Sequence, residues 1–291
     1  MNYKASFEIL RPINCIMGSL TVVIGILNTR LAVSSERLII NLVLGVITYF
    51  FLAGSGMTIN DIYDIEIDKI NRPSRPIPSG RVSSYQAKQL YVITLLLGLF
   101  FAVINSLIHT INVLTIILAG LFGLMGWIYA KWGKKSGFLG NLLVSVSFSI
   151  GLIYGALLNS QNIPPYIFFF FLTSFFLLLS RELIKGCEDI EGDQTKGVKT
   201  LAITIGIKKT TIIAIICKIF AIIFFILPLF TSIINLFLFL ITMIPGLVVI
   251  SYSLFLSLKI PDKTKAEFGR ISLMLKLSAM LGLIAFIFAS I

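Results

Sequence analysis

Two acidic segments, 60–68 and 188–193, hold the side chains best suited to chemistry in this chain. Four of the 13 acidic residues lie at 61–68, and five more lie in or just before the second segment, between 182 and 193. Almost everything around them is apolar. Carboxylates against a membrane-like background are costly unless a cation binds them. The two segments are therefore predicted to bind cations.

The spacing within each segment brings its oxygen atoms to one side. Asn60, Asp64 and Asp68 are four residues apart, so on an α-helix they project from one face. Asp189 and Asp193 have the same spacing. Oxygen ligands without His or Cys suit a hard cation, Mg²⁺ above all, which is usually held by a few carboxylates together with substrate phosphates. Two such clusters could hold Mg²⁺ ions bridged by a diphosphate.

Basic residues accompany both acidic segments. Arg72 and Arg75 follow the first, Lys185 precedes the second by one helical turn, and Lys134 and Lys135 come from the chain between them. Guanidinium and ammonium groups neutralise phosphate oxygens. With metal and cations stabilising a departing diphosphate, an allylic carbon–oxygen bond can ionise. The alternative is that these charges form a solvated rim at helix ends, but two clusters with one spacing favour a ligand site.

The elements that must position these residues are membrane helices. The chain has 291 residues, of which 57% are hydrophobic and 13% charged, which excludes an ordinary soluble domain. A span needs about 20 apolar residues. Nine runs qualify: 12–30, 38–59, 86–107, 110–130, 138–159, 164–184, 210–230, 233–258 and 269–290. We expect an all-α membrane protein of nine transmembrane helices, forming one domain over 1–291.

Two details of these runs carry separate expectations. The first run follows Lys4 and Arg11 as a signal peptide would, but it is long and no small-residue cleavage site follows it, so it is predicted to remain as a span. Pro245 and Gly246 interrupt the eighth run, which predicts a kink or a break there.

The net charge of +11 is explained by topology rather than by nucleic acid. With nine spans and a cytoplasmic N-terminus, 22 of the 24 basic residues fall on cytoplasmic segments, and only Arg30 and Arg37 do not. Cytoplasmic loops carry such an excess of Lys and Arg. Both acidic segments then face the cytoplasm, and the C-terminus is external.

Cysteine and histidine usage removes other kinds of site. His109 is the only histidine and is predicted to lie in a short external turn, which excludes a His-based metal site. Cys15, Cys187 and Cys217 form no C-x-x-C pair, so no disulfide is expected.

These motifs together resemble the UbiA superfamily of intramembrane prenyltransferases. That family carries N-x-x-x-D-x-x-x-D after its second span and D-x-x-x-D after its sixth, as in the two segments above. The stretch 72–80 resembles the family's continuation of the first motif, with Asn71 in place of Asp. Tyr129, Lys134 and Asn141 resemble a third signature, and Arg11 with Asn14 resembles the opening of the family's first helix.

The resemblance implies a fold and a set of roles. The fold is a nine-helix bundle around a central cavity, with a Mg²⁺-bound isoprenyl diphosphate and an amphipathic lipid acceptor in the membrane. The metal ligands would be Asn60, Asp64, Asp68, Asp189 and Asp193, with Asp61 as a further ligand or an acceptor-side base. The diphosphate or phosphate would be bound by Arg11, Asn14, Arg72, Arg75, Lys134 and Lys185. The candidate catalytic residues are Asp64, Tyr129, which would lie near the reacting carbon, and Lys185.

The acceptor is suggested by the detail of the motifs. The segments 60–64, 188–193 and 199–202 look most like the archaeal branch of the family. That branch joins geranylgeranyl diphosphate to geranylgeranylglyceryl phosphate in ether-lipid synthesis. The nearest alternative is an aromatic prenyltransferase of quinone biosynthesis, of the 4-hydroxybenzoate or naphthoate type. A cation transporter is a third hypothesis, but it predicts acids spread through the bilayer depth rather than gathered at one face.

Overall fold

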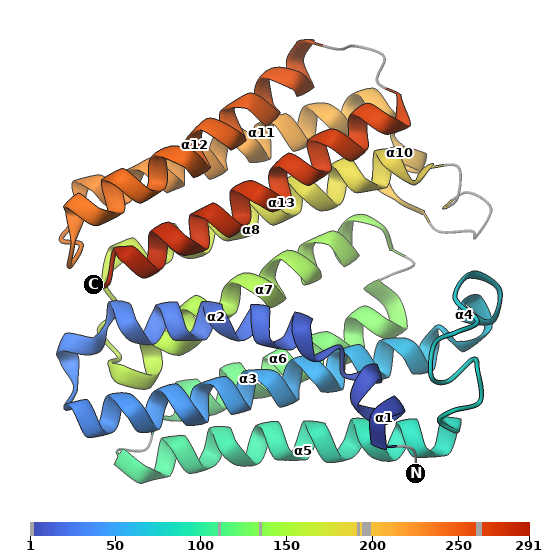
Figure 1. Ribbon diagram of the computed structural model, residues 1–291, viewed down its shortest axis with the longest axis horizontal. Coiled ribbons are helices and arrows are strands. Elements are labelled where there is room, and N and C mark those ends of the chain that lie inside the picture. The colour runs from blue at the N-terminus through green and yellow to red at the C-terminus, as the bar shows by residue number, and fades with distance from the viewer. Residues whose placement is uncertain (1–2, 110–111, 134–135, 191–192, 194–198, 260–263) are drawn as a thin grey trace. The chain divides into compact units, whose positions relative to one another are not determined.

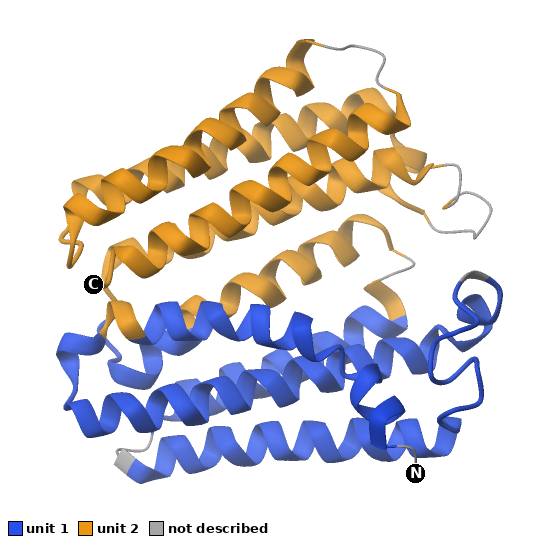
Figure 2. Cartoon of the chain, viewed as in Figure 1, with its two compact units in different colours: residues 1–26, 30–131, 154–162 blue, residues 27–29, 132–153, 163–291 orange. Residues whose placement is uncertain are grey.

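A computed structural model describes residues 3–109, 112–133, 136–190, 193, 199–259 and 264–291. All the regular elements in these ranges are helices (Figure 1). The prediction of an all-α protein is confirmed. The chain divides into two compact units, which are described separately below (Figure 2). The single domain expected over 1–291 stays a prediction.

Unit 1 comprises residues 1–26, 30–131 and 154–162. Its helices are α1 (Tyr3–Ile9), α2 (Pro12–Asn28), the short 3-10 helix η1 (Arg30–Ala32), α3 (Ser35–Tyr63), α4 (Ile65–Asn71), α5 (Ser84–His109) and α6 (Val113–Ile128), followed by a π-helical turn, η2 (Tyr129–Gly133). Helix α3 packs along α5 and α6. Its core gathers Val22 of α2, Tyr49 and Leu52 of α3, Ala102 of α5, Ala119 of α6 and Leu158 at the end of α7.

Unit 2 comprises residues 27–29, 132–153 and 163–291. Its elements are α7 (Phe138–Asn159, whose last residues belong to unit 1), α8 (Pro165–Glu188), α10 (Leu201–Thr204), α11 (Ile207–Ile226), the 3-10 helix η3 (Leu227–Phe230), α12 (Leu236–Lys259) and α13 (Lys265–Phe288). Helix α8 packs against α11 and α13, and α13 packs against α12. Phe170 and Phe286 stack with ring centroids 3.9 Å apart, which joins α8 to α13.

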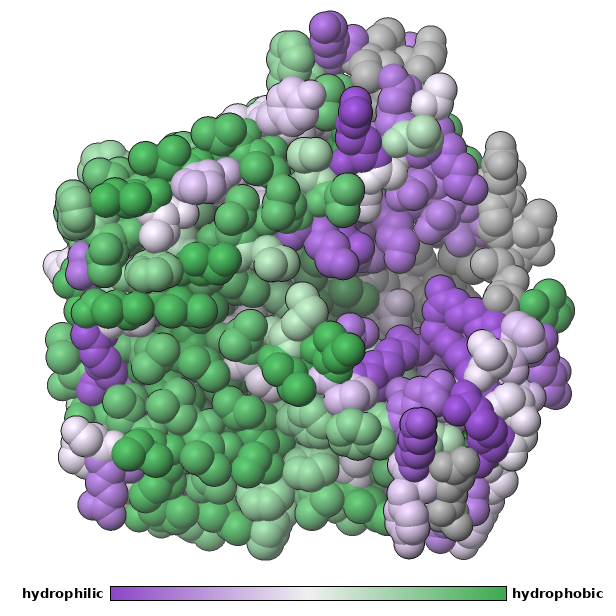
Figure 3. Space-filling model, in the orientation of Figure 1, coloured by the Kyte–Doolittle hydropathy of each residue, from purple (hydrophilic) through white to green (hydrophobic). Residues whose placement is uncertain are grey.

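The long helices have the length and composition of membrane spans. Eight described helices qualify, and the pair α1 and α2, bent by 49° at the break between them, adds a ninth if it counts as one span. In unit 1 the polar surface gathers near α4, and in unit 2 it gathers near α10, while the helix flanks are largely apolar (Figure 3). The chain is thus an integral membrane protein.

Two expectations about the helices differ from the structure in detail. The break considered at Pro245 and Gly246 is absent, since helix α12 runs from Leu236 to Lys259 with Pro245 inside it, and the kink stays a prediction. Lys218, assigned above to a cytoplasmic segment, is fully buried in α11, where its ammonium group donates to Ser257 Oγ and to the carbonyl of Ser253, 3.4 Å away. Hydrogen bonds to α12 compensate for placing this charge in the apolar core.

Helix α3 is long enough to carry the start of the first acidic segment. It begins at Ser35, where the Ser34 hydroxyl accepts the Arg37 N–H, and it continues for 29 residues. At 1.5 Å per residue this is about 44 Å, against an apolar bilayer core of about 30 Å. Helix α3 is therefore longer than the apolar core, and we expect its polar last turns, with Asn60 and Asp61, to extend past it.

A glycine lets α7 and α2 approach closely. A Cβ added at Gly155 would lie 2.1 Å from the carbonyl oxygen of Val22. Gly155→Ala is therefore expected to lower the free energy of unfolding by about 1–3 kcal/mol, the usual range for overpacking. Thermal unfolding in detergent measures this. Gly120→Ala in α6, where an added Cβ meets nothing within 4 Å, is the control, and equal melting temperatures for both variants would contradict the close approach.

Candidate active site

The first acidic segment lies at the junction of α3 and α4. Helix α3 ends at Tyr63 and α4 begins at Ile65, with Asp64 between them at φ −92° and ψ 2°. The single helix expected through this segment is therefore interrupted at Asp64. The four-residue spacing survives, because the Asp64 N–H donates to the Asn60 carbonyl at 3.0 Å and the Asp68 N–H to the Asp64 carbonyl at 2.8 Å.

The three aspartates of this junction are buried. Asp61 is 4%, Asp64 4% and Asp68 5% exposed. A solvated rim would leave them accessible to water, so that interpretation fails for this segment. A buried carboxylate must be neutralised by a partner charge and hydrogen bonds, because its desolvation is expensive.

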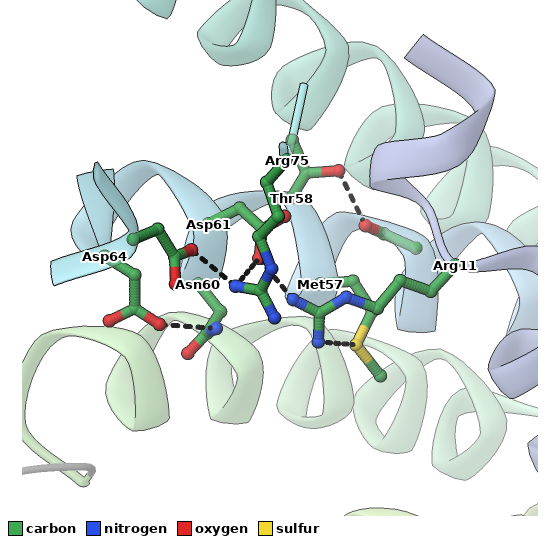
Figure 4. Close-up of polar contacts among 9 residues, drawn as sticks. Arg11, Met57, Thr58, Asn60, Asp61, Asp64 and Arg75 are labelled. Atoms are coloured by element: carbon green, nitrogen blue, oxygen red, sulfur yellow. Dashed lines mark hydrogen bonds and ion pairs between the residues drawn. The ribbon is translucent and has the colours of Figure 1, made fainter. Parts of the chain in front are cut away.

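Each buried carboxylate has a partner (Figure 4). Asn60 Nδ2 donates to Asp64 Oδ2 at 3.0 Å. Asp68 pairs with Arg75. Asp61 Oδ1 pairs with Arg11 and, at 3.3 Å, with the same Arg75 Nη1 that reaches Asp68. The structure thus brings together six of the predicted site residues: Arg11, Asn60, Asp61, Asp64, Asp68 and Arg75. Three of them, Asn60, Asp64 and Asp68, were predicted as metal ligands from their spacing in the sequence.

Arg11 reaches this network from the break between α1 and α2. Its φ of 50° is the left-handed conformation that non-glycine residues seldom adopt. Pro12 follows it and disfavours the helical conformation for the preceding residue. The guanidinium also donates to the Met57 thioether, with 3.7 Å between Nη1 and Sδ.

The loop 72–83 carries Arg75 and is fastened to α1. Arg81 donates to both carboxylate oxygens of Glu8, at 2.6 and 3.0 Å. Helix α1, the loop and the start of α5 also bury an apolar cluster made of Ala5, Ile9, Ile77, Val82 and Ala87. Both arginines of the site therefore depend on the packing of α1.

The second acidic segment begins where α8 ends. The Asp189 N–H donates to the Lys185 carbonyl at 3.0 Å, and the Asp193 N–H donates to the Asp189 carbonyl at 2.9 Å. Asp189 and Asp193 are half-buried, and Lys185 is exposed. This segment belongs to unit 2, and the structure does not relate it to the α3–α4 junction of unit 1.

The remaining predicted residues are placed as follows. Tyr129 follows α6 at the start of η2 and is half-buried, whereas Asn14 on α2 and Arg72 after α4 are exposed. Lys134 lies outside the described residues.

The donor set at the α3–α4 junction suits Mg²⁺ chemically. Asn60, Asp64 and Asp68 offer only oxygen ligands, which a hard cation prefers. Among the described residues, no three His, Cys, Asp or Glu side chains are arranged as a complete metal-binding group. In this structure guanidinium groups stand beside Asp61 and Asp68.

The pairings Arg11–Asp61 and Glu8–Arg81 could not be predicted from the sequence. Their partners are 50 and 73 residues apart, and no motif spacing links them. The one local signal was Arg11 before a proline, which marks a break in a helix.

The Glu8–Arg81 pair leads to a prediction about the loop. Arg81→Ala should loosen α1 from the loop and speed amide hydrogen exchange across 72–83, because the loop loses its two hydrogen bonds to Glu8. Hydrogen-exchange mass spectrometry in detergent measures this. Lys69→Ala, which removes the exposed pair with Glu66 in α4, is the control. Equal exchange in wild type and Arg81→Ala would contradict the proposed fastening.

Comparisons with known proteins agree on the family. The model of the UbiA prenyltransferase family matches residues 19–288. A digeranylgeranylglyceryl phosphate synthase of Saccharolobus solfataricus is 37% identical over 297 aligned positions, covering 100% of this chain and 98% of the relative. A protein of the same name from Sulfurisphaera tokodaii is 39% identical, covering 79% of this chain and 80% of the relative.

Solved structures agree on the fold. A structure described as digeranylgeranylglyceryl phosphate synthase superposes with a TM-score of 0.83 at 32% identity, covering 99% of this chain and 98% of that one. A UbiA homologue from Archaeoglobus fulgidus bound to GPP and Mg²⁺ has a TM-score of 0.68 at 18% identity, covering 97% and 99%. The chain belongs to the UbiA prenyltransferase family, as its motifs predicted, and is a membrane prenyltransferase.

Proposed function

We propose that this chain transfers a geranylgeranyl group from geranylgeranyl diphosphate to geranylgeranylglyceryl phosphate in archaeal ether-lipid synthesis, with Mg²⁺ as cofactor. The observation that carries the proposal is the oxygen set of the half-buried Asn60 and the buried Asp64 and Asp68, with Arg75 paired to Asp68. Relatives named for this reaction align with nearly the whole chain. Carboxylates next to guanidinium groups suit a substrate that is a metal diphosphate.

The proposed metal ligands are Asn60, Asp64 and Asp68 of unit 1 and Asp189 and Asp193 of unit 2. A homologue of the same fold binds GPP with Mg²⁺, which supports a metal-dependent reaction. Bound Mg²⁺ would neutralise the charge that develops on the departing diphosphate. Asn60 would also orient a second ligand, because its amide N–H donates to the Asp64 carboxylate.

The proposed diphosphate and phosphate ligands are five basic residues and Asn14. Arg11 and Arg75 are held in place by Asp61, whereas Arg72, Lys185 and Asn14 are exposed and accessible to a substrate head group. Lys134 completes the proposed set. Tyr129 is proposed to lie near the reacting allylic carbon, where the electron-rich face of an aromatic ring can stabilise positive charge.

The metal proposal predicts the effect of single substitutions. Asp64→Ala and Asp189→Ala should each lower turnover more than about 100-fold, because loss of a ligand should exceed the 10–100-fold effect of losing an outer-shell partner. Turnover is measured with labelled geranylgeranyl diphosphate in detergent, alongside size-exclusion profiles that confirm folding. Glu66→Gln is the control: this exposed acid pairs with Lys69 and should leave turnover unchanged. Full activity in both aspartate variants would contradict the ligand assignment.

The identity of the acceptor is tested by giving one membrane preparation a choice of acceptor substrates. Membranes containing the protein receive labelled geranylgeranyl diphosphate with either geranylgeranylglyceryl phosphate or 4-hydroxybenzoate. The proposal predicts label in the glyceryl phosphate product, and its loss when Mg²⁺ is chelated. Labelling of 4-hydroxybenzoate alone would favour the aromatic prenyltransferases of quinone synthesis instead.

We further propose nine spans, with the N-terminus and the active site in the cytoplasm and the C-terminus outside. The distribution of Lys and Arg supports this orientation. A cysteine introduced by Ile291→Cys, at an exposed position, should react with a membrane-impermeant maleimide in intact cells. Tyr3→Cys, also exposed, should react only after the cells are opened. The three native cysteines are buried and keep the background low. The reverse labelling pattern would overturn the orientation.

A further inference from the structure

Asp61 differs from its acidic neighbours because two arginines converge on it. We infer that Asp61 is a positioning residue, which holds Arg11 and Arg75 for a phosphate group of the substrate, and that it is not a ligand of Mg²⁺. The inference rests on the proposed function, since it assigns the arginines to the phosphate of that reaction.

The contacts of Asp61 place it between the arginines. Its Oδ1 accepts from Arg11 Nη2 and, at 3.3 Å, from Arg75 Nη1. The carboxylate is 5% exposed, while the Arg11 and Arg75 side chains are 28% and 17% exposed. The Asp61 carboxylate is therefore covered, whereas the two guanidinium groups that it holds remain partly accessible to a ligand. A metal at Asp61 would compete with two guanidinium groups for a buried carboxylate.

The backbone of Arg11 supports the same assignment. A non-glycine residue in the left-handed region persists only where its surroundings fix it, and such residues gather at functional sites. Arg11 is held there by its carbonyl, which accepts the N–H groups of Asn14 and Cys15 at 2.9 and 3.2 Å, and by the pair with Asp61. The break between α1 and α2 thereby directs this side chain at the carboxylate.

The two arginines retain hydrogen-bonding capacity for a phosphate. Within the part of the chain that the structure describes, Arg75 contacts both Asp61 and Asp68 through Nη1. Its other N–H groups can then form the two-pronged contact that guanidinium makes with phosphate oxygens. Arg11 donates Nη1 to the Met57 sulfur, a weak acceptor that a phosphate oxygen can replace.

Asp61 also matters once a metal binds Asp68. A cation at Asp68 would compete with Arg75 for that carboxylate. Asp61 would keep Arg75 beside the site during this exchange, because it holds the same nitrogen independently. The phosphate could belong to the diphosphate of the donor or to the acceptor lipid, and both have the chemistry that a pair of guanidinium groups recognises.

Asp61→Asn keeps the size of the side chain and removes its charge, so it tests the inference. Binding is measured on the full chain in detergent, with Mn²⁺ followed by electron paramagnetic resonance and inorganic diphosphate followed by calorimetry at fixed Mg²⁺. We expect Mn²⁺ affinity within about twofold of wild type and diphosphate affinity about 10–100-fold weaker, the usual effect of losing an orienting partner. Asp64→Asn is the comparison variant and should lose Mn²⁺ affinity.

The outcomes separate the possible roles. If Asp61→Asn loses Mn²⁺ affinity as Asp64→Asn does, Asp61 is a metal ligand and the inference is wrong. Wild-type affinity for both Mn²⁺ and diphosphate would also overturn it. Should Asp61→Asn fail to fold, Arg11→Lys and Arg75→Lys serve instead. They are expected to weaken diphosphate binding and spare Mn²⁺, and unchanged diphosphate binding in both would count against the inference.

Kinetics then identify the phosphate. A rise in the KM for geranylgeranyl diphosphate alone would assign the arginines to the donor, and a rise in the KM for geranylgeranylglyceryl phosphate alone would assign them to the acceptor. Either result supports the positioning role if kcat changes less than KM. The binding measurements use Mn²⁺ and inorganic diphosphate, so they remain valid even if the proposed acceptor is wrong.

Discussion

Burial of three aspartates at the end of a membrane helix is the constraint on which the α3–α4 junction depends. Asp61, Asp64 and Asp68 are almost inaccessible to water. Carboxylates in such surroundings need cations and hydrogen-bond donors. In this structure Arg11, Arg75 and the Asn60 amide supply them. A metal diphosphate would bring both a cation for these acids and an anion for these arginines, which is why the junction suits the family's reaction.

Several elements serve this one requirement. The excess length of α3 carries the acids past its apolar stretch, and the turn at Asp64 redirects the chain into α4. The break at Arg11 brings one arginine from the start of the chain, and the loop 72–83 returns the other. Helix α1 packs on that loop through Ile9, Ile77 and the Glu8–Arg81 pair. The polar chemistry is thus supported by ordinary apolar packing nearby.

The sequence predicted most of the fold because membrane spans are local features. Each of the nine apolar runs corresponds to one long helix, from α2 to α13. The exceptions depended on tertiary contacts. Lys218 was counted among the cytoplasmic charges although it falls in the apolar run 210–230, and hydrogen bonds to α12 allow it to lie buried in α11. Pro245 and Gly246 predicted a kink or a break, and α12 continues through them without a break.

The site was predictable only where spacing carries the information. The four-residue interval of Asn60, Asp64 and Asp68 is visible in sequence, and the structure keeps it through two backbone hydrogen bonds. The turn at Asp64 was not visible, since nothing in the residue types there marks the end of a helix. The partner of Asp61 was not visible either, because Arg11 lies 50 residues away and reaches it only through the break between α1 and α2. Spacing within a segment predicts which side chains share a face, but it does not predict which distant charge will neutralise them.

The central claim is that the oxygen set of the α3–α4 junction binds the metal of a diphosphate substrate. Anomalous X-ray diffraction from crystals grown with Mn²⁺ and inorganic diphosphate tests it most directly. The account predicts a Mn²⁺ peak bound to Asp64 and Asp68, with Arg75 turned from Asp68 to the diphosphate and still paired with Asp61. Mn²⁺ bound elsewhere in the protein, with the Arg75–Asp68 pair intact and no peak at the junction, would contradict it.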